Sequence, residues 1–102
     1  MVSREVIEGT QLQGEDERIA YTINTAPWGG TPSGVAVVAK DKSANYAVVT
    51  GTVLSGSASV NGDVITCPVL GSLIRGHSYR IEVFFVSGGQ ILEPYFNVKC
   101  EQ

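Results

Sequence analysis

Glycine and proline interrupt this sequence at short intervals, and the stretches between them are too short for most helices. The breakers recur roughly every eight to twelve residues, separated by runs rich in valine, isoleucine and threonine. No segment shows a sustained 3.6-residue hydrophobic period, so we expect almost no helix. The chain has 102 residues, which is close to the usual size of one domain. We therefore predict a single all-β domain over residues 1–102.

Alternating runs mark the expected strands. In residues 17–24, Ile19, Tyr21 and Ile23 occupy every second position, which predicts a strand with one buried face. The other expected strands are residues 2–7, 35–40, 46–50, 58–60, 63–67, 79–86 and 91–100. About seven such strands, with regularly spaced turns, are typical of an immunoglobulin-like or fibronectin-III-like antiparallel β-sandwich.

Two of the breaker segments lead to specific predictions. Asn61-Gly62 stands between two short apolar runs and predicts a type I′ hairpin turn, in which both central residues have positive φ. Residues 26–34 are rich in glycine and proline, so they are predicted to form a loop. Trp28 lies in that loop. Its ring is either a contact for a protein or a carbohydrate, or a plug that closes one end of the sandwich.

The spacing Leu73-x-x-Gly76-x-x-Tyr79 is typical of a tyrosine corner. In such a corner the ring packs at the edge of the core, and its hydroxyl bonds to the backbone a few residues upstream. A buried phenol needs this partner, because an unpaired one costs about 1–3 kcal/mol. We therefore assign structural roles to Leu73, Gly76 and Tyr79. The corner indicates architecture and carries no chemistry.

If Tyr79 points inward, alternation along its strand predicts which neighbours point outward. Outward positions on this strand and on the next one bring together four apolar or aromatic side chains: Phe84, Val86, Ile91 and Tyr95. Exposed clusters of this kind often mark a protein contact. With Trp28 they are our interface candidates. The alternative is that a loop or the N-terminal strand covers them.

We find no constellation of residues for catalysis, metal binding or a cofactor. The glycines of residues 71–78 have the spacing of a phosphate-binding loop, but the lysine of that motif is replaced by His77 and no helix follows. As the only histidine, His77 is expected in a solvent-facing turn. One histidine and two distant cysteines are a poor set of zinc ligands. We expect no enzyme.

Charge and hydropathy exclude two classes of partner. The net charge is −3 and the seven Lys and Arg residues are scattered, which disfavours nucleic acid. No apolar run approaches the roughly 18 residues of a membrane helix, and the first residues do not read as a signal peptide.

Cys67 and Cys100 are too few for a disulfide framework. We prefer two free buried thiols, with a single disulfide as the alternative.

Residues from about 17 to 100 resemble small immunoglobulin-like structural proteins of tailed bacteriophages, of the tail, tail-fibre adaptor or head–tail type. The residues that carry the resemblance are Tyr21-Thr22-Ile23, Gly56 to Thr66, the Leu73 to Tyr79 corner, Gly88-Gly89 and Phe96-Asn97-Val98. The chain departs from those proteins by lacking a tryptophan in residues 1–13, and its cysteines lie outside the shared pattern.

The resemblance implies a non-enzymatic virion structural or assembly module without a cofactor. Its partners would be other virion proteins, with self-association possible, and it would be made in the cytoplasm of the bacterial host. The alternative function is an accessory or adhesion immunoglobulin-like domain of a bacterial surface protein, located outside the cell and contacting glycans through Trp28.

Overall fold

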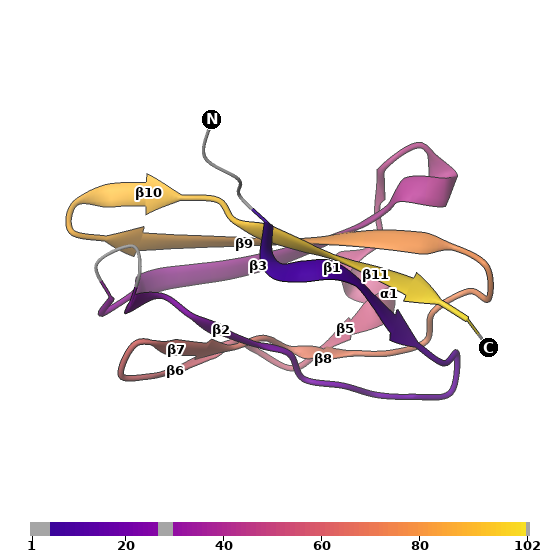
Figure 1. Ribbon diagram of the computed structural model, residues 1–102, viewed down its shortest axis with the longest axis horizontal. Helices are drawn as coiled ribbons and strands as arrows, with labels where there is room; N and C mark the ends of the chain where they lie inside the picture. Colours follow the sequence, from indigo (N-terminus) through magenta and orange to yellow (C-terminus); the bar gives the residue numbers. More distant parts are fainter. Residues whose placement is uncertain (1–4, 27–29, 102) are drawn as a thin grey trace.

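The computed structural model describes residues 5–26 and 30–101 and consists mainly of strands (Figure 1). Its largest sheet, here called the six-stranded sheet, has the order β1-β11-β9-β3-β4, and β10 also pairs with β9. The pairing is antiparallel except between β1 and β11, which run parallel. The strands are β1 (Glu5–Gln13), β3 (Ser33–Asp41), β4 (Ala47–Val48), β9 (Ser78–Ser87), β10 (Gln90–Leu92) and β11 (Tyr95–Cys100).

The shorter strands form a second layer that faces the six-stranded sheet in Figure 1. One small sheet has the order β2-β7-β6 and the other pairs β5 with β8. A bridge between Ile19 and Leu70 ties the segment before β2 to β8. The strands of this layer are β2 (Thr22–Asn24), β5 (Leu54–Ser55), β6 (Ser59–Asn61), β7 (Val64–Thr66) and β8 (Val69–Leu70). Two helical turns flank β4 in the chain: η2 (Lys42–Ala44) precedes it and α1 (Thr50–Val53) follows it.

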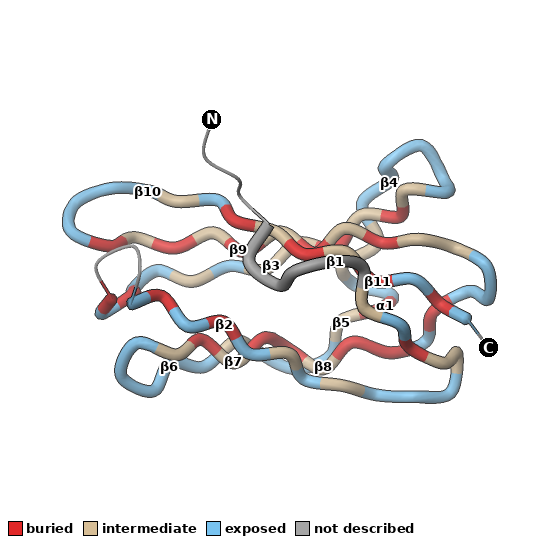
Figure 2. The backbone as a smooth tube through the Cα atoms, viewed as in Figure 1, coloured by how far each residue is buried: buried red, intermediate tan, exposed pale blue. Residues whose placement is uncertain are grey.

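The core is formed by inward side chains from both layers. Burial alternates along the whole of β9, because successive side chains of a strand point to opposite faces. Its inward apolar residues, each at most 1% exposed, are Tyr79, Ile81, Val83 and Phe85. They share one hydrophobic cluster with Ile23 of β2 and Ile65 of β7. Figure 2 shows the buried positions recurring along strands of both layers.

The prediction of an all-β chain with very little helix is confirmed, since helix in the described part of the chain is confined to short turns such as η2 and α1. The finer prediction, an immunoglobulin-like sandwich of about seven strands, is not confirmed. The described residues form eleven strands in three sheets, because the expected last strand is divided in two and because β5 and β8 were not expected.

The expected hairpin is present, but its predicted turn is wrong. Asn61 pairs with Val64, so the two turn residues are Gly62 and Asp63. Only Gly62 has positive φ, at 62°, whereas a type I′ turn at Asn61-Gly62 requires two. Glycine at the first central position is the type II′ preference. Two successive positive φ values occur instead at Gly88-Gly89, between β9 and β10.

Two expected strands are shorter than predicted. Within residues 17–24 only β2 is a regular strand, although Ile19, Tyr21 and Ile23 are each less exposed than their neighbours. Residues 46–50 contain only the two residues of β4, after which the chain enters α1.

Two further strands have unexpected limits. Residues 91–100 are divided into β10 and β11 at Pro94, which has no N–H to donate and whose carbonyl accepts from Val83 N–H at 2.8 Å. The first strand begins at Glu5 and extends to Gln13, and residues 2–4 of the predicted strand lie outside the described residues.

Candidate functional site

The outer face of the six-stranded sheet holds the predicted contact residues. Every second side chain of β9 points away from the core and is partly exposed, and three of these are Glu82, Phe84 and Val86. The predicted facing of β9 is therefore confirmed. On this face the residues of β9 lie between those of β3 on one side and those of β10 and β11 on the other.

Three of the candidates lie together, and we call them the apolar patch: Phe84, Val86 and Ile91. Ile91 pairs directly with Val86, so both side chains project from the same face. Phe84 is two residues along β9 and pairs with exposed Ala36 of β3. Ile91 is 74% exposed, which is unusual for a large apolar side chain at the centre of a short strand. The patch therefore presents apolar surface to solvent at one end of the sheet.

Tyr95 lies beside the apolar patch but has a different environment. It pairs with Glu82, and the guanidinium carbon of Arg80 lies 3.9 Å from its ring centroid. Glu82 also forms ion pairs with Lys40 at 3.2 Å and with Arg80 at 3.6 Å. We call these four residues the charged strip. Because Arg80 occupies one face of the Tyr95 ring, only part of that ring is available to a partner.

Trp28 lies outside the described residues, but hydrogen bonds hold the two ends of its loop in place. The N–H of Gly30 donates to the carbonyl of Thr25 at 3.1 Å, and Ser87 Oγ donates to the carbonyl of Gly30 at 2.7 Å. A Cβ at Gly30 would lie 2.4 Å from Asp63 Oδ1, and its φ is 69°, so this position requires glycine. These bonds fix the base of the loop next to the end of β9, near Val86.

Tyr79 has the contacts expected of a tyrosine corner. Its side chain is 1% exposed, and its hydroxyl accepts a hydrogen bond of 2.8 Å from the backbone N–H of Ile74, five residues upstream. Leu73 is buried and Gly76 has a φ of 84°. Burial raises the pKa of the Tyr79 phenol, and the charges of Asp41 and Cys100 raise it further against the lowering effect of the Ile74 bond. The group is therefore a neutral phenol near pH 7.

Tyr79→Phe is expected to lower the free energy of unfolding by about 1–2 kcal/mol, because the N–H of Ile74 loses its partner. Tyr46→Phe is the matched control: its side chain is half-exposed, and we expect a change below about 0.5 kcal/mol. Urea denaturation of both variants measures the difference. Equal stabilities for the two variants would show that the corner bond contributes nothing.

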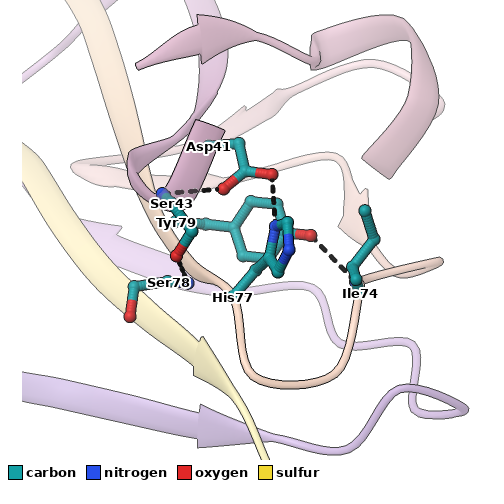
Figure 3. A network of polar contacts seen from close by, with 6 residues as sticks. All are labelled: Asp41, Ser43, Ile74, His77, Ser78 and Tyr79. Atoms are coloured by element: carbon teal, nitrogen blue, oxygen red, sulfur yellow. Dashed lines mark hydrogen bonds and ion pairs between the residues drawn. The ribbon is translucent and has the colours of Figure 1, made fainter. Parts of the chain in front are cut away.

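His77 belongs to a polar network that its sequence position does not indicate (Figure 3). Its Nδ1 lies 2.7 Å from Asp41 Oδ2, and its side chain is 31% exposed, so this residue beside the turn has a polar partner while it stays partly open to solvent. Asp41 Oδ1 accepts from the N–H of Ser43, and Ser43 Oγ accepts from the N–H of Ser78. The bond between Asp41 and Ser43 caps η2, and the other two contacts link the end of β3 and η2 to His77 and to the start of β9. These are the contacts of a structural network.

Both cysteines are buried and neither forms a disulfide, as the preferred one of the two alternatives predicted. Burial raises the pKa of the Cys67 thiol to about 11. The nucleophile and metal ligand is the thiolate, so Cys67 is a weak nucleophile near neutral pH. Cys67 therefore behaves as an apolar core residue.

The described residues contain neither a cluster of metal ligands nor a membrane-spanning helix. In residues 5–26 and 30–101, no group of three His, Cys, Asp or Glu side chains is placed to hold a metal ion. Within the same ranges no helix has the length and apolarity needed to span a membrane.

Comparisons of the chain with protein-family models, curated proteins and solved structures found no match. The function of the apolar patch and the charged strip is therefore inferred from the side chains that form them.

Proposed function

We propose that this chain is a non-enzymatic assembly module that acts through protein–protein contacts made by the apolar patch. One observation carries the proposal: Ile91 is 74% exposed on the same sheet face as its partner Val86 and as Phe84. Burying large apolar side chains contributes about 25 cal/mol per Å², and isolated domains rarely leave such clusters in water without a use.

The surroundings of the patch support a protein partner. The charged strip borders it with a carboxylate, two cations and a tyrosine. An apolar centre next to a polar, charged margin is the usual anatomy of a protein interface, in which tyrosine and arginine are enriched. The patch also stands on regular strands whose opposite sides are packed in the core, so its residues need little ordering before they bind.

We further propose that the two layers form an immunoglobulin-like sandwich and that the module belongs to a virion. The two-layer arrangement and the Tyr79 bond support the sandwich. The resemblance to small structural proteins of tailed bacteriophages supports the virion, with other virion proteins as partners. The protein would then be synthesised in the bacterial cytoplasm and incorporated into the particle.

Ile91→Glu and Phe84→Glu are expected to weaken binding to the assembly partner strongly without unfolding the domain. The chain is co-expressed with the product of each neighbouring gene, and complexes are purified and analysed by size-exclusion chromatography with light scattering. Val60→Glu is the matched control, since Val60 is an exposed apolar strand residue in the other layer. We expect a loss of affinity of about 100-fold for a residue central to the interface, and none for the control.

Three results would contradict the proposal. One is that the neighbouring genes encode no virion or packaging protein, which would favour the surface-protein function. Another is that Ile91→Glu and Val60→Glu bind the partner equally well. A third is that Ile91→Glu unfolds the domain by circular dichroism, because the side chain would then be part of the core.

A further inference from the structure

The edge of β3 is only partly paired. Along β3, Ser33 and the residues from Ala36 to Asp41 pair with β9 on one side, and the register shifts between Ser33 and Ala36. On the other side β4 pairs only with Lys40 and Asp41. Across residues 33–38 no described residue forms a strand pair on that second side. β3 therefore has an open edge beside the outer face of the six-stranded sheet.

The hydrogen bonds of Ala39 show which backbone groups face this edge. Its N–H donates to Thr50 Oγ1 at 3.1 Å and its carbonyl accepts from Val49 N–H at 2.9 Å, so both point away from β9. Backbone groups of successive strand residues alternate in direction. The N–H and C=O of Val37 therefore point to the open edge, where no described residue pairs with them. By the same alternation the N–H of Ala36 points to β9, so the carbonyl of Val35, on the opposite side of the peptide that these two residues share, points to the open edge.

The open segment lacks most of the features that protect an edge strand. Its residues Val35-Ala36-Val37-Val38 carry no charge and no proline, although lysine, proline and short length are the usual safeguards against added strands. Other edge strands are short: β2 and β6 have three residues each, and β4 has two. Only the irregular pairing between Ser33 and Ala36 disturbs the edge.

We propose that the open edge of β3 binds the same edge of a second copy of this chain, with the two strands antiparallel about a twofold axis. The register places Ala36 opposite its own counterpart and Val35 opposite Val37. In this register the N–H of Val37 in each copy donates to the carbonyl of Val35 in the other copy. The register ends before Lys40, so β4 of either copy is not displaced.

Charge and size favour a second copy as the occupant. The facing segments are both uncharged, so no like charges meet, and the net charge of −3 gives little long-range repulsion. Ala36 is exposed and small, which leaves room at the twofold axis. A contact of about five residues a side is small, so the pairing is expected to be weak and concentration-dependent. This inference concerns the backbone edge of β3, which adjoins the apolar patch where Ala36 pairs with Phe84, and it does not depend on the proposed function.

The test uses charge at the twofold axis. Ala36→Lys and Ala36→Glu are each expected to weaken self-association about tenfold or more in sedimentation velocity, because two like charges would lie about 5 Å apart. An equimolar mixture is expected to restore association through heterodimers. Val60→Lys is the matched control and should associate like the unmodified chain.

Amide hydrogen exchange separates edge pairing from packing of the sheet faces. The N–H of Val37 is expected to exchange more slowly as concentration rises, and to lose that protection in Ala36→Lys. Three results would overturn the inference: a monomer at all concentrations up to about 1 mM, association of Ala36→Lys equal to that of the unmodified chain, or dimers without protection of Val37. If dimers are lost in Phe84→Glu and Val37 is never protected, the apolar patch alone mediates the association.

Discussion

Replacing Gln13 by leucine is expected to lower the free energy of unfolding by about 3 kcal/mol. Gln13 is 1% exposed and joins three parts of the chain. Its Nε2 donates to the carbonyl of Leu70 at 2.7 Å and to that of Glu17 at 3.0 Å, and its Oε1 accepts from the hydroxyl of Tyr21 at 3.0 Å. Leucine fills a similar volume but leaves buried polar groups without partners, which is the costly case for hydrogen bonds.

Urea denaturation of Gln13→Leu measures this effect. Gln90→Leu is the matched control, because Gln90 is exposed on β10 and its replacement is expected to change stability by less than about 0.5 kcal/mol. A Gln13→Leu variant as stable as the control would mean that the three bonds contribute nothing to folding.

Raising the pH from 9 to 11 is expected to cost about 2 kcal/mol of stability through Cys67. Burial raises the pKa of this thiol from 9.0 to about 11 in the folded chain. Between these values the unfolded chain has lost the proton and the folded chain still binds it, so unfolding becomes easier as pH rises. Two pKa units correspond to about 2.7 kcal/mol. The contribution is complete below pH 9 and is lost progressively up to pH 11.

The measurement compares unfolding by urea at pH 8 and pH 11 for the unmodified chain and for Cys67→Ala. The variant is less stable at both pH values, because it leaves a small cavity. Between pH 8 and pH 11 the free energy of unfolding of Cys67→Ala should fall by about 2–3 kcal/mol less than that of the unmodified chain. Burial also raises the phenol pKa values of Tyr21 and Tyr79, so these two groups lower the free energy of unfolding at high pH in the unmodified chain and in Cys67→Ala alike. If the free energy of unfolding fell equally in the two proteins between pH 8 and pH 11, Cys67 would not be a buried, protonated thiol.

Local pattern accounts for the parts of the fold that the sequence predicted well. Alternation along β9 predicted which side chains enter the core, because the period of two is a property of the extended backbone. The Leu73 to Tyr79 spacing predicted the bond from Ile74 to the phenol for a similar reason, since all of its members lie within seven residues. The outward position of Ile91 followed from its neighbours on the strand.

Contacts between distant residues could not be predicted in this way. Asp41 and His77 are 36 residues apart, and Gln13 reaches Leu70 across 57, so no local spacing indicates either pair. The division of the last strand at Pro94 and the position of the turn at Gly62 depend on register. Register is determined by packing between layers as well as by the turn residues.

Hydroxyl-radical footprinting of the chain, alone and in its assembled complex, tests the central claim most directly. The claim predicts that labelling of Ile91, Val86 and Phe84 falls on assembly, while exposed Val60 and Ile74 in other parts of the molecule stay equally reactive. Protection of Val60 or Ile74 with undiminished labelling of Ile91 would place the contact elsewhere and contradict the account.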